Sequence, residues 1–424
     1  MIPLSWSEIE ALGLGQLRGA PADGVVRRVH DDSRAARPGD LFVALNTGVR
    51  FVDDAIARGA ATLVPRDQEA ALARLASLVR GRTDAQVVAI VGSTGKTTTK
   101  DALAALCGAV TPTVAAEASR NNELGLPLTV LRLEPDTKVL VTEMGMRGLG
   151  QIAELCAIAR PTLVLVTSIG PEHLELVGTV DDVARANAEA IEALPAGGVA
   201  VVPDGEVLLE PYLRSDLDVR RFDRASVVRN DNSWSFTVAG RDVSLELPFT
   251  QRHLAENVLA ALTAYDALGL ALERAAEGAA AIRLSRWRGE VYELPGGGLV
   301  VNDAYNANPV SMRAALLDLA ERAAGRRRVA ILGEMAELGD ESDRYHEEIA
   351  SLLGELGVEL VVAVGDRAGA YLAHAAEGLR VDCAESFESF ADALRPGDAI
   401  LVKASRAVGL EGIPALIQKH SSAW

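Results

Sequence analysis

The sequence predicts an α/β protein of three domains, and three observations lead to that prediction. The chain has 424 residues, 49% of them hydrophobic, which is long for a single core. From residue 87 onward, short β-branched runs alternate with helical stretches, the rhythm of a mostly parallel sheet. Polar or glycine-rich stretches near residues 82 and 288 interrupt that rhythm. We therefore expect domains at residues 1–82, 83–288 and 289–424.

The first 82 residues are expected to form a small α/β domain. Hydrophobic periodicity predicts helices at 7–13 and 51–59 and strands at 24–29 and 41–45. A polar turn that contains the sequence DSR lies between the two strands. The polar cluster at 81–84 predicts the linker to the central domain.

The central domain opens on Val87–Asp101, VVAIVGSTGKTTTKD, which reads as a buried strand, a glycine-rich turn and a helix. Glycines let backbone N–H groups approach a phosphate, and the helix N-terminus adds a positive dipole end. Lys96 is expected to reach the outer phosphates and Thr97 to ligate Mg²⁺. The alternative is a strand-to-helix turn without a ligand. The predicted nucleotide-binding residues are Gly92, Ser93, Thr94, Gly95, Lys96, Thr97 and Thr98.

Later strands continue this sheet. Apolar runs at 139–143, 163–167 and 199–202 predict a mostly parallel sheet of the P-loop ATPase type. Ile90 stands where the common P-loop has its first glycine, so the loop is a shorter variant. Alternating residues at 226–247 predict an antiparallel pair, and a long helix is expected at 253–268. The turn at 286–289, together with the glycines at 296–298, predicts the second linker.

The last domain is expected to be Rossmann-like. Strands are predicted at 299–301, 329–332, 360–364 and 399–402, with helices between them. No G-x-G-x-x-G motif accompanies these strands.

Polar side chains follow several strands, at the sheet edge where open α/β proteins bind ligands. Glu143 suits Mg²⁺, since a hard cation prefers carboxylate oxygen; a solvated strand-end carboxylate is the alternative. His173 is a candidate metal ligand or a structural histidine. Asn121 and Asn122 can bind polar groups of a substrate or simply form a turn.

A second polar cluster follows the first strand of the third domain. Asp303 lies at a strand end, where an aspartate can accept both hydroxyls of a ribose. Tyr305, Asn306 and Asn308 offer hydrogen-bonding groups to a peptide-like ligand. A helix N-cap and a turn explain Asn308 equally well.

Two basic residues lie at the end of the last predicted strand. Lys403 is one of only five lysines in an arginine-rich chain, which suggests chemistry that arginine cannot replace. Arg406 has a planar guanidinium that suits a carboxylate or a phosphate. An exposed basic turn is the alternative for both.

Composition excludes several classes of function. A formal net charge of −17 argues against nucleic acid as a partner, because phosphate backbones bind basic surfaces. Cys107, Cys156 and Cys383 lie far apart and predict neither disulfides nor a metal cluster, which fits a reducing cytoplasm. No apolar run is long enough to span a membrane, and the first residues lack the pattern of a signal peptide. We expect a cytoplasmic protein that binds small-molecule phosphates.

Seven segments in a fixed order resemble the Mur ligase family. The resemblance covers nearly the whole chain and rests on GSTGKTTTKD, SRNNELGLPLTVL, EMGMRGLGQI, TSIGPEHLELVG, NDAYNANPVSM, ILGEMAELG and LVKASR. The segments YNANP and ILGEMAELG are similar to those of members that add a dipeptide rather than a single amino acid.

The resemblance implies a reaction. ATP and two Mg²⁺ ions would activate the terminal carboxylate of UDP-N-acetylmuramoyl-tripeptide as an acyl phosphate, and the amine of D-Ala-D-Ala would then attack it. The product is the pentapeptide of peptidoglycan synthesis. Family precedent is monomeric. Another Mur-type amide ligase and a non-catalytic nucleotide-binding homologue are the alternatives.

The resemblance also implies roles for individual residues. Lys96, His173 and Arg288 would be catalytic, and Thr97, Glu143 and His173 would ligate metal. The remaining roles would be divided as follows: Asn257, Arg288 and Asp303 for the nucleotide, and Ser33, Arg34, Asn121, Asn122, Tyr305, Asn306, Asn308, Lys403 and Arg406 for the substrates.

Three positions depart from the family pattern. Asn187 stands where the family has a lysine that becomes carbamylated and helps hold the second metal. Either Asn187 offers a neutral oxygen, or Glu189 compensates, or the second metal binds weakly. Val49 replaces the histidine of a G-H-x-F segment, so contacts at the uracil end are expected to differ. Ala404 replaces a glycine, a mild change unless the backbone there requires glycine.

Overall fold

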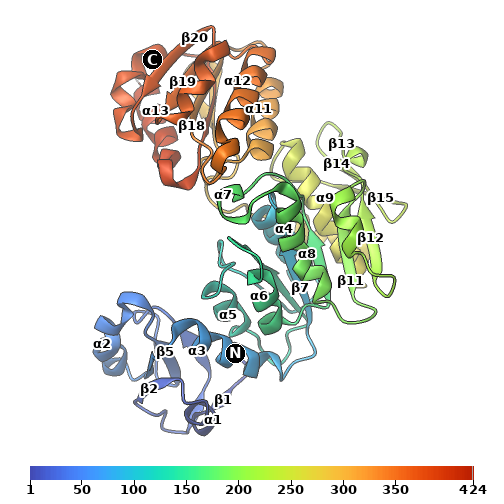
Figure 1. Ribbon diagram of the computed structural model, residues 1–424, viewed down its shortest axis with the longest axis vertical. Coiled ribbons are helices and arrows are strands. Elements are labelled where there is room, and N and C mark those ends of the chain that lie inside the picture. Colours follow the sequence, from blue (N-terminus) through green and yellow to red (C-terminus); the bar gives the residue numbers. More distant parts are fainter. Residues whose placement is uncertain (423) are drawn as a thin grey trace. The chain divides into compact units, whose positions relative to one another are not determined.

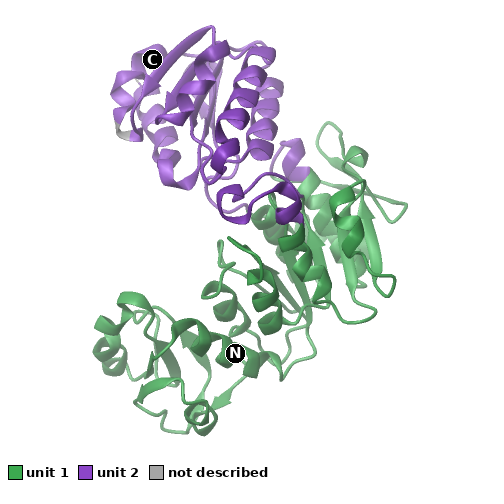
Figure 2. Ribbon diagram, in the orientation of Figure 1, with its two compact units in different colours: residues 1–168, 185–248, 256–283 green, residues 169–184, 249–255, 284–424 purple. Residues whose placement is uncertain are grey.

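A computed structural model describes residues 1–422 and 424, and all of their side chains except that of residue 385 (Figure 1). The chain forms two compact units (Figure 2). Unit 1 comprises residues 1–168, 185–248 and 256–283, and unit 2 comprises residues 169–184, 249–255 and 284–424. Each unit contains its own parallel sheet, which confirms the predicted α/β class.

The amino-terminal part of unit 1 is built on a four-stranded sheet of order β2-β6-β5-β4. Strands β4, β5 and β6 are parallel, and β2 joins the edge in the antiparallel direction. The expected strand at 24–29 is divided into two short strands, of which β3 pairs with β1 instead. The elements are β1 (Leu4–Ser5), α1 (Trp6–Ala11), β2 (Gly15–Arg18), β3 (Val25–Val26), β4 (Arg28–His30), β5 (Asp40–Val43), α2 (Val52–Ala57), β6 (Ala61–Pro65) and α3 (Gln68–Arg80).

A buried arginine anchors this part of the chain within unit 1. Arg80 is the last residue of α3, and only 8% of it is exposed. Its guanidinium donates to the carbonyls of Ala159, at 2.7 Å, and Arg160, at 3.1 Å. Charged hydrogen bonds of this kind compensate the loss of hydration on burial, so the end of α3 is fixed against the end of α6.

The central sheet of unit 1 has six strands, all parallel, in the order β12-β11-β10-β7-β9-β8. Residues Val87–Val91 of β7 are fully buried, as expected for an interior strand with both faces covered. The elements around it are β7 (Gln86–Val91), α4 (Lys96–Gly108), β8 (Thr113–Ala115), α5 (Gly125–Val130), β9 (Val139–Glu143), α6 (Gln151–Ala159), β10 (Leu163–Val166), α8 (Val180–Glu192), β11 (Val199–Pro203), β12 (Asp218–Phe222), α9 (Arg252–Ala267) and α10 (Ala275–Ala279).

The segment at 226–247 forms three antiparallel strands rather than two. Strands β14 (Trp234–Val238) and β15 (Arg241–Leu245) make the expected pair, and β13 (Val228–Arg229) adds a short edge. Trp234, Phe236 and Val238 alternate inward, which is the periodicity that predicted the pair.

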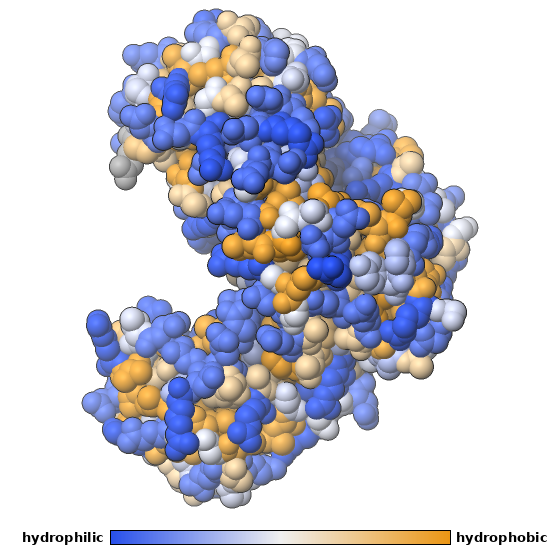
Figure 3. Space-filling view, viewed as in Figure 1, coloured by the Kyte–Doolittle hydropathy of each residue, from blue (hydrophilic) through white to orange (hydrophobic). Residues whose placement is uncertain are grey.

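Unit 2 contains a six-stranded sheet of order β16-β17-β21-β18-β19-β20. All neighbouring pairs are parallel except β16 with β17. Polar residues gather on the face that carries α11 and α12 (Figure 3). The elements are α7 (Leu174–Val177), β16 (Glu290–Leu294), β17 (Gly298–Asn302), α11 (Pro309–Ala323), β18 (Arg328–Gly333), α12 (Ser342–Glu355), β19 (Leu360–Val364), β20 (Glu377–Val381), β21 (Ala399–Lys403) and α13 (Ile413–Ser421).

The glycines at 296–298 form a hairpin turn and not the linker that the sequence predicted, while the boundary near residue 288 stays a prediction. Leu294 pairs with Gly298, and the glycines turn the chain from β16 into β17. Gly296 and Gly297 have φ values of 74° and 80°, which glycine adopts without strain. A hairpin at the edge of a parallel sheet explains the glycines, because the reversal of direction needs a tight turn.

None of the helices that the structure describes has the length and apolar character needed to cross a membrane.

Candidate functional site

The glycine-rich loop lies at the carboxyl end of β7 and runs directly into α4, as the sequence predicted. Lys96, the first residue of α4, folds its ammonium back onto the loop and donates to the carbonyls of Gly92 and Ser93. A lysine held against loop carbonyls is a mobile point charge that a phosphate can attract away. The seven residues Gly92–Thr98 therefore form one local structure around Lys96.

Both glycines of the loop are required by their surroundings. Gly92 has a φ of 120°, and a Cβ there would lie 2.4 Å from Thr167 Oγ1. Gly95 has a φ of 91°, and a Cβ there would lie 2.3 Å from Asn257 Oδ1. Both the backbone conformation and the close packing thus exclude larger residues. The predicted nucleotide residue Asn257, in α9, is brought against the second glycine of the loop.

The next strand of the sheet supplies a second support for the loop. Ser168 follows β10, and its carbonyl accepts the Ser93 N–H at 2.8 Å. Its hydroxyl accepts the Thr94 N–H at 3.0 Å. Ser168 was not among the site residues predicted from the sequence. The available signal was a small hydroxyl residue directly after a buried strand that neighbours β7.

Glu143 ends β9, opposite Ile90 of β7, and is almost fully buried. Its Oε1 accepts hydrogen bonds from Thr97 Oγ1, at 3.1 Å, and from Asn121 Nδ2, at 2.8 Å. Its Oε2 is buried and has no hydrogen-bond partner within the described structure. A buried carboxylate oxygen without a donor is costly unless a cation approaches it. The structure thus brings three predicted residues together around a place that suits a divalent cation.

Two of the possible substitutes for the family lysine have other partners. Asn187, in α8, is 1% exposed, and its Oδ1 accepts the Gly92 N–H at 2.6 Å. Glu189 accepts the N–H groups of Gly150, at 2.6 Å, and Ala153, at 3.0 Å. These bonds satisfy donors at the start of α6, as a capping carboxylate does. The oxygen atoms of both side chains are therefore engaged by backbone amides.

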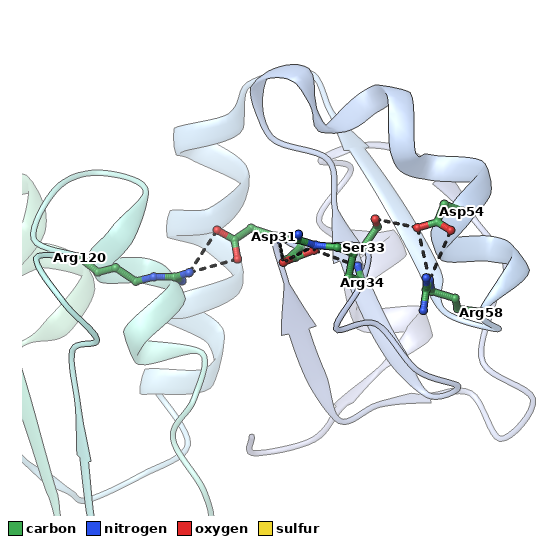
Figure 4. A network of polar contacts seen from close by, with 7 residues as sticks. Asp31, Ser33, Arg34, Asp54, Arg58 and Arg120 are labelled. Atoms are coloured by element: carbon green, nitrogen blue, oxygen red, sulfur yellow. Dashed lines mark hydrogen bonds and ion pairs between the residues drawn. The ribbon is translucent and has the colours of Figure 1, made fainter.

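Ser33 and Arg34, which were predicted to bind a substrate, lie in the polar network of Figure 4. The Ser33 hydroxyl donates to Asp54 Oδ2 at 2.9 Å, and Ser33 is buried. Arg34 is exposed and pairs with Asp32 at 2.7 Å. Hydrogen bonds from Arg34 lower the pKa of Asp32 to about 2.

An ion pair connects this network with the loop that carries the two asparagines. Arg120 Nη2 lies 3.4 Å from Asp31 Oδ1 (Figure 4). Arg120 directly precedes Asn121, which binds Glu143 as described above. Asn122 accepts the Gly125 N–H at 2.9 Å and so fixes the start of α5. The turn interpretation of Asn122 therefore has a structural basis, while Asn121 points to the carboxylate.

His173 lies in unit 2, where its Nδ1 forms a hydrogen bond with the carboxylate of Glu337. Both residues have positive φ, 50° and 61° respectively. A carboxylate at Nδ1 orients the ring, and the other ring nitrogen, Nε2, lies 4.0 Å from the carboxylate of Glu172. Glu337 belongs to the segment ILGEMAELG, and the sequence analysis did not single it out. Side chains that meet across 164 residues leave no local sequence signal.

Lys403 and Asp303 are brought together, with the lysine ammonium 2.5 Å from the carboxylate. Lys403 is 2% exposed and also donates to the carbonyl of Asn306 at 2.9 Å. The two residues form a partly buried ion pair at adjacent strand ends, β17 and β21, and their separate ligand roles stay predictions.

Two arginines stack on aromatic rings in the same unit. The guanidinium of Arg288 lies 3.9 Å from the centre of the Tyr305 ring, and that of Arg406 lies 4.4 Å from the Trp287 ring. The Tyr305 N–H donates to the Trp287 carbonyl at 3.1 Å. Stacking fixes the planes of the guanidinium groups. Arg288, Tyr305 and Arg406 therefore form a continuous cluster.

Asn308 caps α11, because its Oδ1 accepts the Ser311 N–H at 2.8 Å. Ala404 lies in ordinary backbone conformation, so the position does not require glycine.

No group of three or more His, Cys, Asp or Glu side chains suited to a metal occurs among the described residues. A cation at Glu143 would therefore share its coordination sphere with a hydroxyl and with ligand oxygens.

Comparisons with known proteins agree with this geometry. The family model described as Mur ligase middle domain matches residues 90–265, and that described as Mur ligase, glutamate ligase domain, matches residues 287–406. The chain is 30% identical to the UDP-N-acetylmuramoyl-tripeptide–D-alanyl-D-alanine ligase of Bacillus subtilis, over 92% of both chains.

Solved structures are similar over nearly the whole chain. MurF from Acinetobacter baumannii has a TM-score of 0.86 and 27% identity, covering 98% of this chain and 99% of that one. MurF from Thermotoga maritima, solved in complex with ADP, has a TM-score of 0.80 and 26% identity, covering 94% of this chain and 98% of that one.

Proposed function

Because the chain belongs to the Mur ligase family, we propose that it joins D-alanyl-D-alanine to UDP-N-acetylmuramoyl-tripeptide in a reaction driven by ATP. ADP, phosphate and the pentapeptide precursor of peptidoglycan are the products. One observation carries the proposal: the phosphate loop and the buried Glu143 occur together in a chain that resembles a ligase of this activity over 92% of its length.

The loop residues bind and orient the triphosphate in this proposal. Lys96 moves from the loop carbonyls to the outer phosphates and neutralises charge as the tripeptide carboxylate approaches the γ-phosphorus. The resulting acyl phosphate is attacked by the dipeptide amine, and phosphate leaves. Gly92 and Gly95 keep the backbone close enough for its N–H groups to contact the nucleotide.

One Mg²⁺ ion fits the residues present. Thr97 and Glu143 would hold it, and the buried Oε2 of Glu143 supports this assignment. When bound, the ion supplies charge neutralisation and polarises the phosphates. The contacts of Asn187 and Glu189 do not fit a ligand role for a second ion, so we derive no step that depends on it.

The remaining predicted residues divide between the two other substrates and the nucleoside. Ser33 and Arg34 would contact the uridine diphosphate end, and Asn121 would lie near the reacting carboxylate. The cluster of Arg288, Tyr305 and Arg406 in unit 2 would bind the nucleoside and the dipeptide. We assign Arg288 and Asp303 to the nucleotide, His173 to a catalytic position, and Asn122, Tyr305, Asn306, Asn308, Lys403 and Arg406 to substrate binding.

We further propose that the protein acts in the cytoplasm as a monomer of three domains, with boundaries near residues 82 and 288. Burial raises the pKa of the Cys107 thiol to about 12. Such a thiol is inert at neutral pH.

Phosphate release measured with ATP, Mg²⁺ and UDP-N-acetylmuramoyl-tripeptide tests the proposal. We expect release only when D-Ala-D-Ala is present. Release that does not depend on the dipeptide, or that requires a single amino acid instead, would contradict the proposal. Absence of release at every Mg²⁺ concentration would favour a non-catalytic nucleotide-binding protein.

A further inference from the structure

A buried amide lies behind the phosphate loop. Asn187 is 1% exposed and comes from α8, 95 residues beyond the loop. Its Oδ1 accepts the Gly92 N–H at 2.6 Å. The first amide of the loop is therefore bound by a side chain from a helix and not by a strand of the sheet.

The bond completes a set that holds successive loop amides. The Gly92 N–H is bound by Asn187, the Ser93 N–H by the Ser168 carbonyl and the Thr94 N–H by the Ser168 hydroxyl. On its other side, the carbonyl of Gly92 accepts from Lys96. Gly92 is thus held at both its N–H and its C=O, next to the lysine that must leave to meet the phosphates.

The chemistry of the acceptor matters because the site binds anions. A carboxylate in this place would bind the same N–H, but its charge would repel a triphosphate across a poorly screened interior. An aliphatic side chain would leave a buried N–H without an acceptor, which is unfavourable because the lost hydration of the N–H is not compensated. A neutral amide oxygen avoids both penalties.

We propose that Asn187 is a positioning residue for the nucleotide: it fixes Gly92 in its left-handed conformation and is not a metal ligand. This inference rests on the nucleotide-binding part of the proposed function. In this role Asn187 does not substitute for the metal-binding lysine of the family but holds the phosphate loop. The loop is held ready for the phosphates by a neutral acceptor rather than by a charged group.

Three variants test the inference. Asn187→Ala removes the acceptor, Asn187→Asp keeps an acceptor of the same shape and adds charge, and Thr142→Val is the matched control. Thr142, in β9, is as buried as Asn187, and its hydroxyl donates to the carbonyl of Val88, in the neighbouring strand β7, at 2.9 Å. The control therefore removes a buried hydrogen bond near the loop without touching it.

The readouts are the dissociation constant of MgADP by calorimetry, the KM values and kcat. For Asn187→Ala we expect the dissociation constant of MgADP and the KM of ATP to rise about tenfold, as for loss of one buried hydrogen bond. The KM of D-Ala-D-Ala and the Mg²⁺ concentration for half-maximal rate stay unchanged. Asn187→Asp also weakens MgADP binding, and Thr142→Val does not.

Other results overturn the inference. Wild-type affinity of Asn187→Ala for MgADP would show that the bond does not position the loop. Equal losses of MgADP affinity in Asn187→Ala and Thr142→Val would show that Asn187 contributes only to general stability. A selective rise in the Mg²⁺ requirement would make residue 187 part of a metal site. If the wild-type protein binds MgADP but does not ligate, the proposed function fails and this inference is still tested by the binding data.

Discussion

At the scale of single residues, Lys96 is the most exacting test of the site. Its ammonium bonds to two loop carbonyls, so the charge is stored within the loop and can be transferred to a ligand. Lys96→Ala is expected to lower kcat/KM for ATP by at least about a hundredfold, because it removes charge stabilisation in the transition state.

The matched variant Lys96→Arg separates charge from shape. Arginine carries the same charge on a planar fork, which does not fit the carbonyls that hold a point-like ammonium. We expect it to stay folded and to remain severely impaired in a steady-state phosphate assay. Full activity of Lys96→Arg would show that the loop tolerates any cation and that the geometry described here is not important.

Glu143 makes a separate prediction about Mg²⁺. Glu143→Gln keeps an oxygen that accepts from Thr97 and Asn121 but removes the buried charge. The Mg²⁺ concentration for half-maximal rate is expected to rise about tenfold or more, which corresponds to 1.4 kcal/mol of lost cation binding. Without nucleotide and metal, the variant is expected to be at least as stable as the wild type, because an uncompensated buried carboxylate has been removed.

A titration of the reaction rate against Mg²⁺ checks the metal requirement of Glu143→Gln, and a thermal unfolding scan checks its stability. An unchanged Mg²⁺ requirement would place the cation elsewhere, and a large loss of stability would show that the carboxylate serves the fold alone.

The sequence could identify the residues of the site that stand in local motifs, and it could not identify their supports. Lys96, Thr97 and Glu143 were predictable because a strand end, a glycine-rich turn and a helix start define them locally. Ser168 and Glu337 were missed because each acts through a partner distant in sequence: Ser168 binds loop amides 74 residues away. The contact between Asp303 and Lys403 was missed for the same reason.

At the scale of elements, the loop after β18 is held by a buried histidine. His346 in α12 accepts the Met335 N–H at Nε2, at 3.1 Å, and donates from Nδ1 to the Ser342 carbonyl at 2.7 Å. These partners fix the neutral tautomer. The loop also carries Glu337, the partner of His173, so His346 stabilises the loop on which that contact depends.

The pH dependence of this loop follows from the direction of the pKa shift. Burial lowers the pKa of His346 below its usual 6.5, against the opposing effects of its hydrogen bond to Ser342 and of Glu334 and Asp343, while Arg367 lowers it further. The unfolded state therefore binds more protons in this range, and stability rises with pH. The stabilisation by His346 is complete above about pH 6.5 and is lost as the pH falls towards the folded-state pKa.

Hydrogen exchange of the segment 334–338 measures the effect directly. After correction for intrinsic exchange rates, the opening free energy of this segment in the wild-type protein is expected to fall between pH 7.5 and pH 5.5 by up to about 1.4 kcal/mol, because pH 5.5 lies one unit below the usual histidine pKa. His346→Gln, which cannot titrate, is expected to show a flatter profile. Parallel profiles in the two proteins would contradict the assignment.

The elements themselves were predictable where apolar periodicity was strong. The strands β7, β9, β10 and β11 are buried and read clearly from the sequence. Edge strands were missed, because they lack a buried run: β12 has the sequence DVRRF, and only its last residue is buried. The glycines before β17 were misinterpreted because a hairpin turn and a linker share the same composition.

At the scale of the whole molecule, the nucleotide loop and the amino-terminal sheet belong to one compact unit, and the His173 and Arg288 clusters belong to the other. Nucleotide contacts predicted from the sequence occur in both. MgADP at a hundred times its dissociation constant is expected to stabilise the folded protein by about 2.7 kcal/mol through mass action. A thermal unfolding scan with and without MgADP measures this, and Lys96→Ala should shift much less. An equal shift in the variant would place the nucleotide elsewhere.

The central claim is that cleavage of ATP is coupled to formation of one peptide bond with D-alanyl-D-alanine. Mass spectrometry of a reaction with UDP-N-acetylmuramoyl-tripeptide, ATP, Mg²⁺ and the dipeptide measures it most directly. We expect a product heavier than the tripeptide substrate by the dipeptide minus one water, formed in equal amounts with ADP and phosphate. ADP formed without that product, or a product that contains a single amino acid, would contradict it.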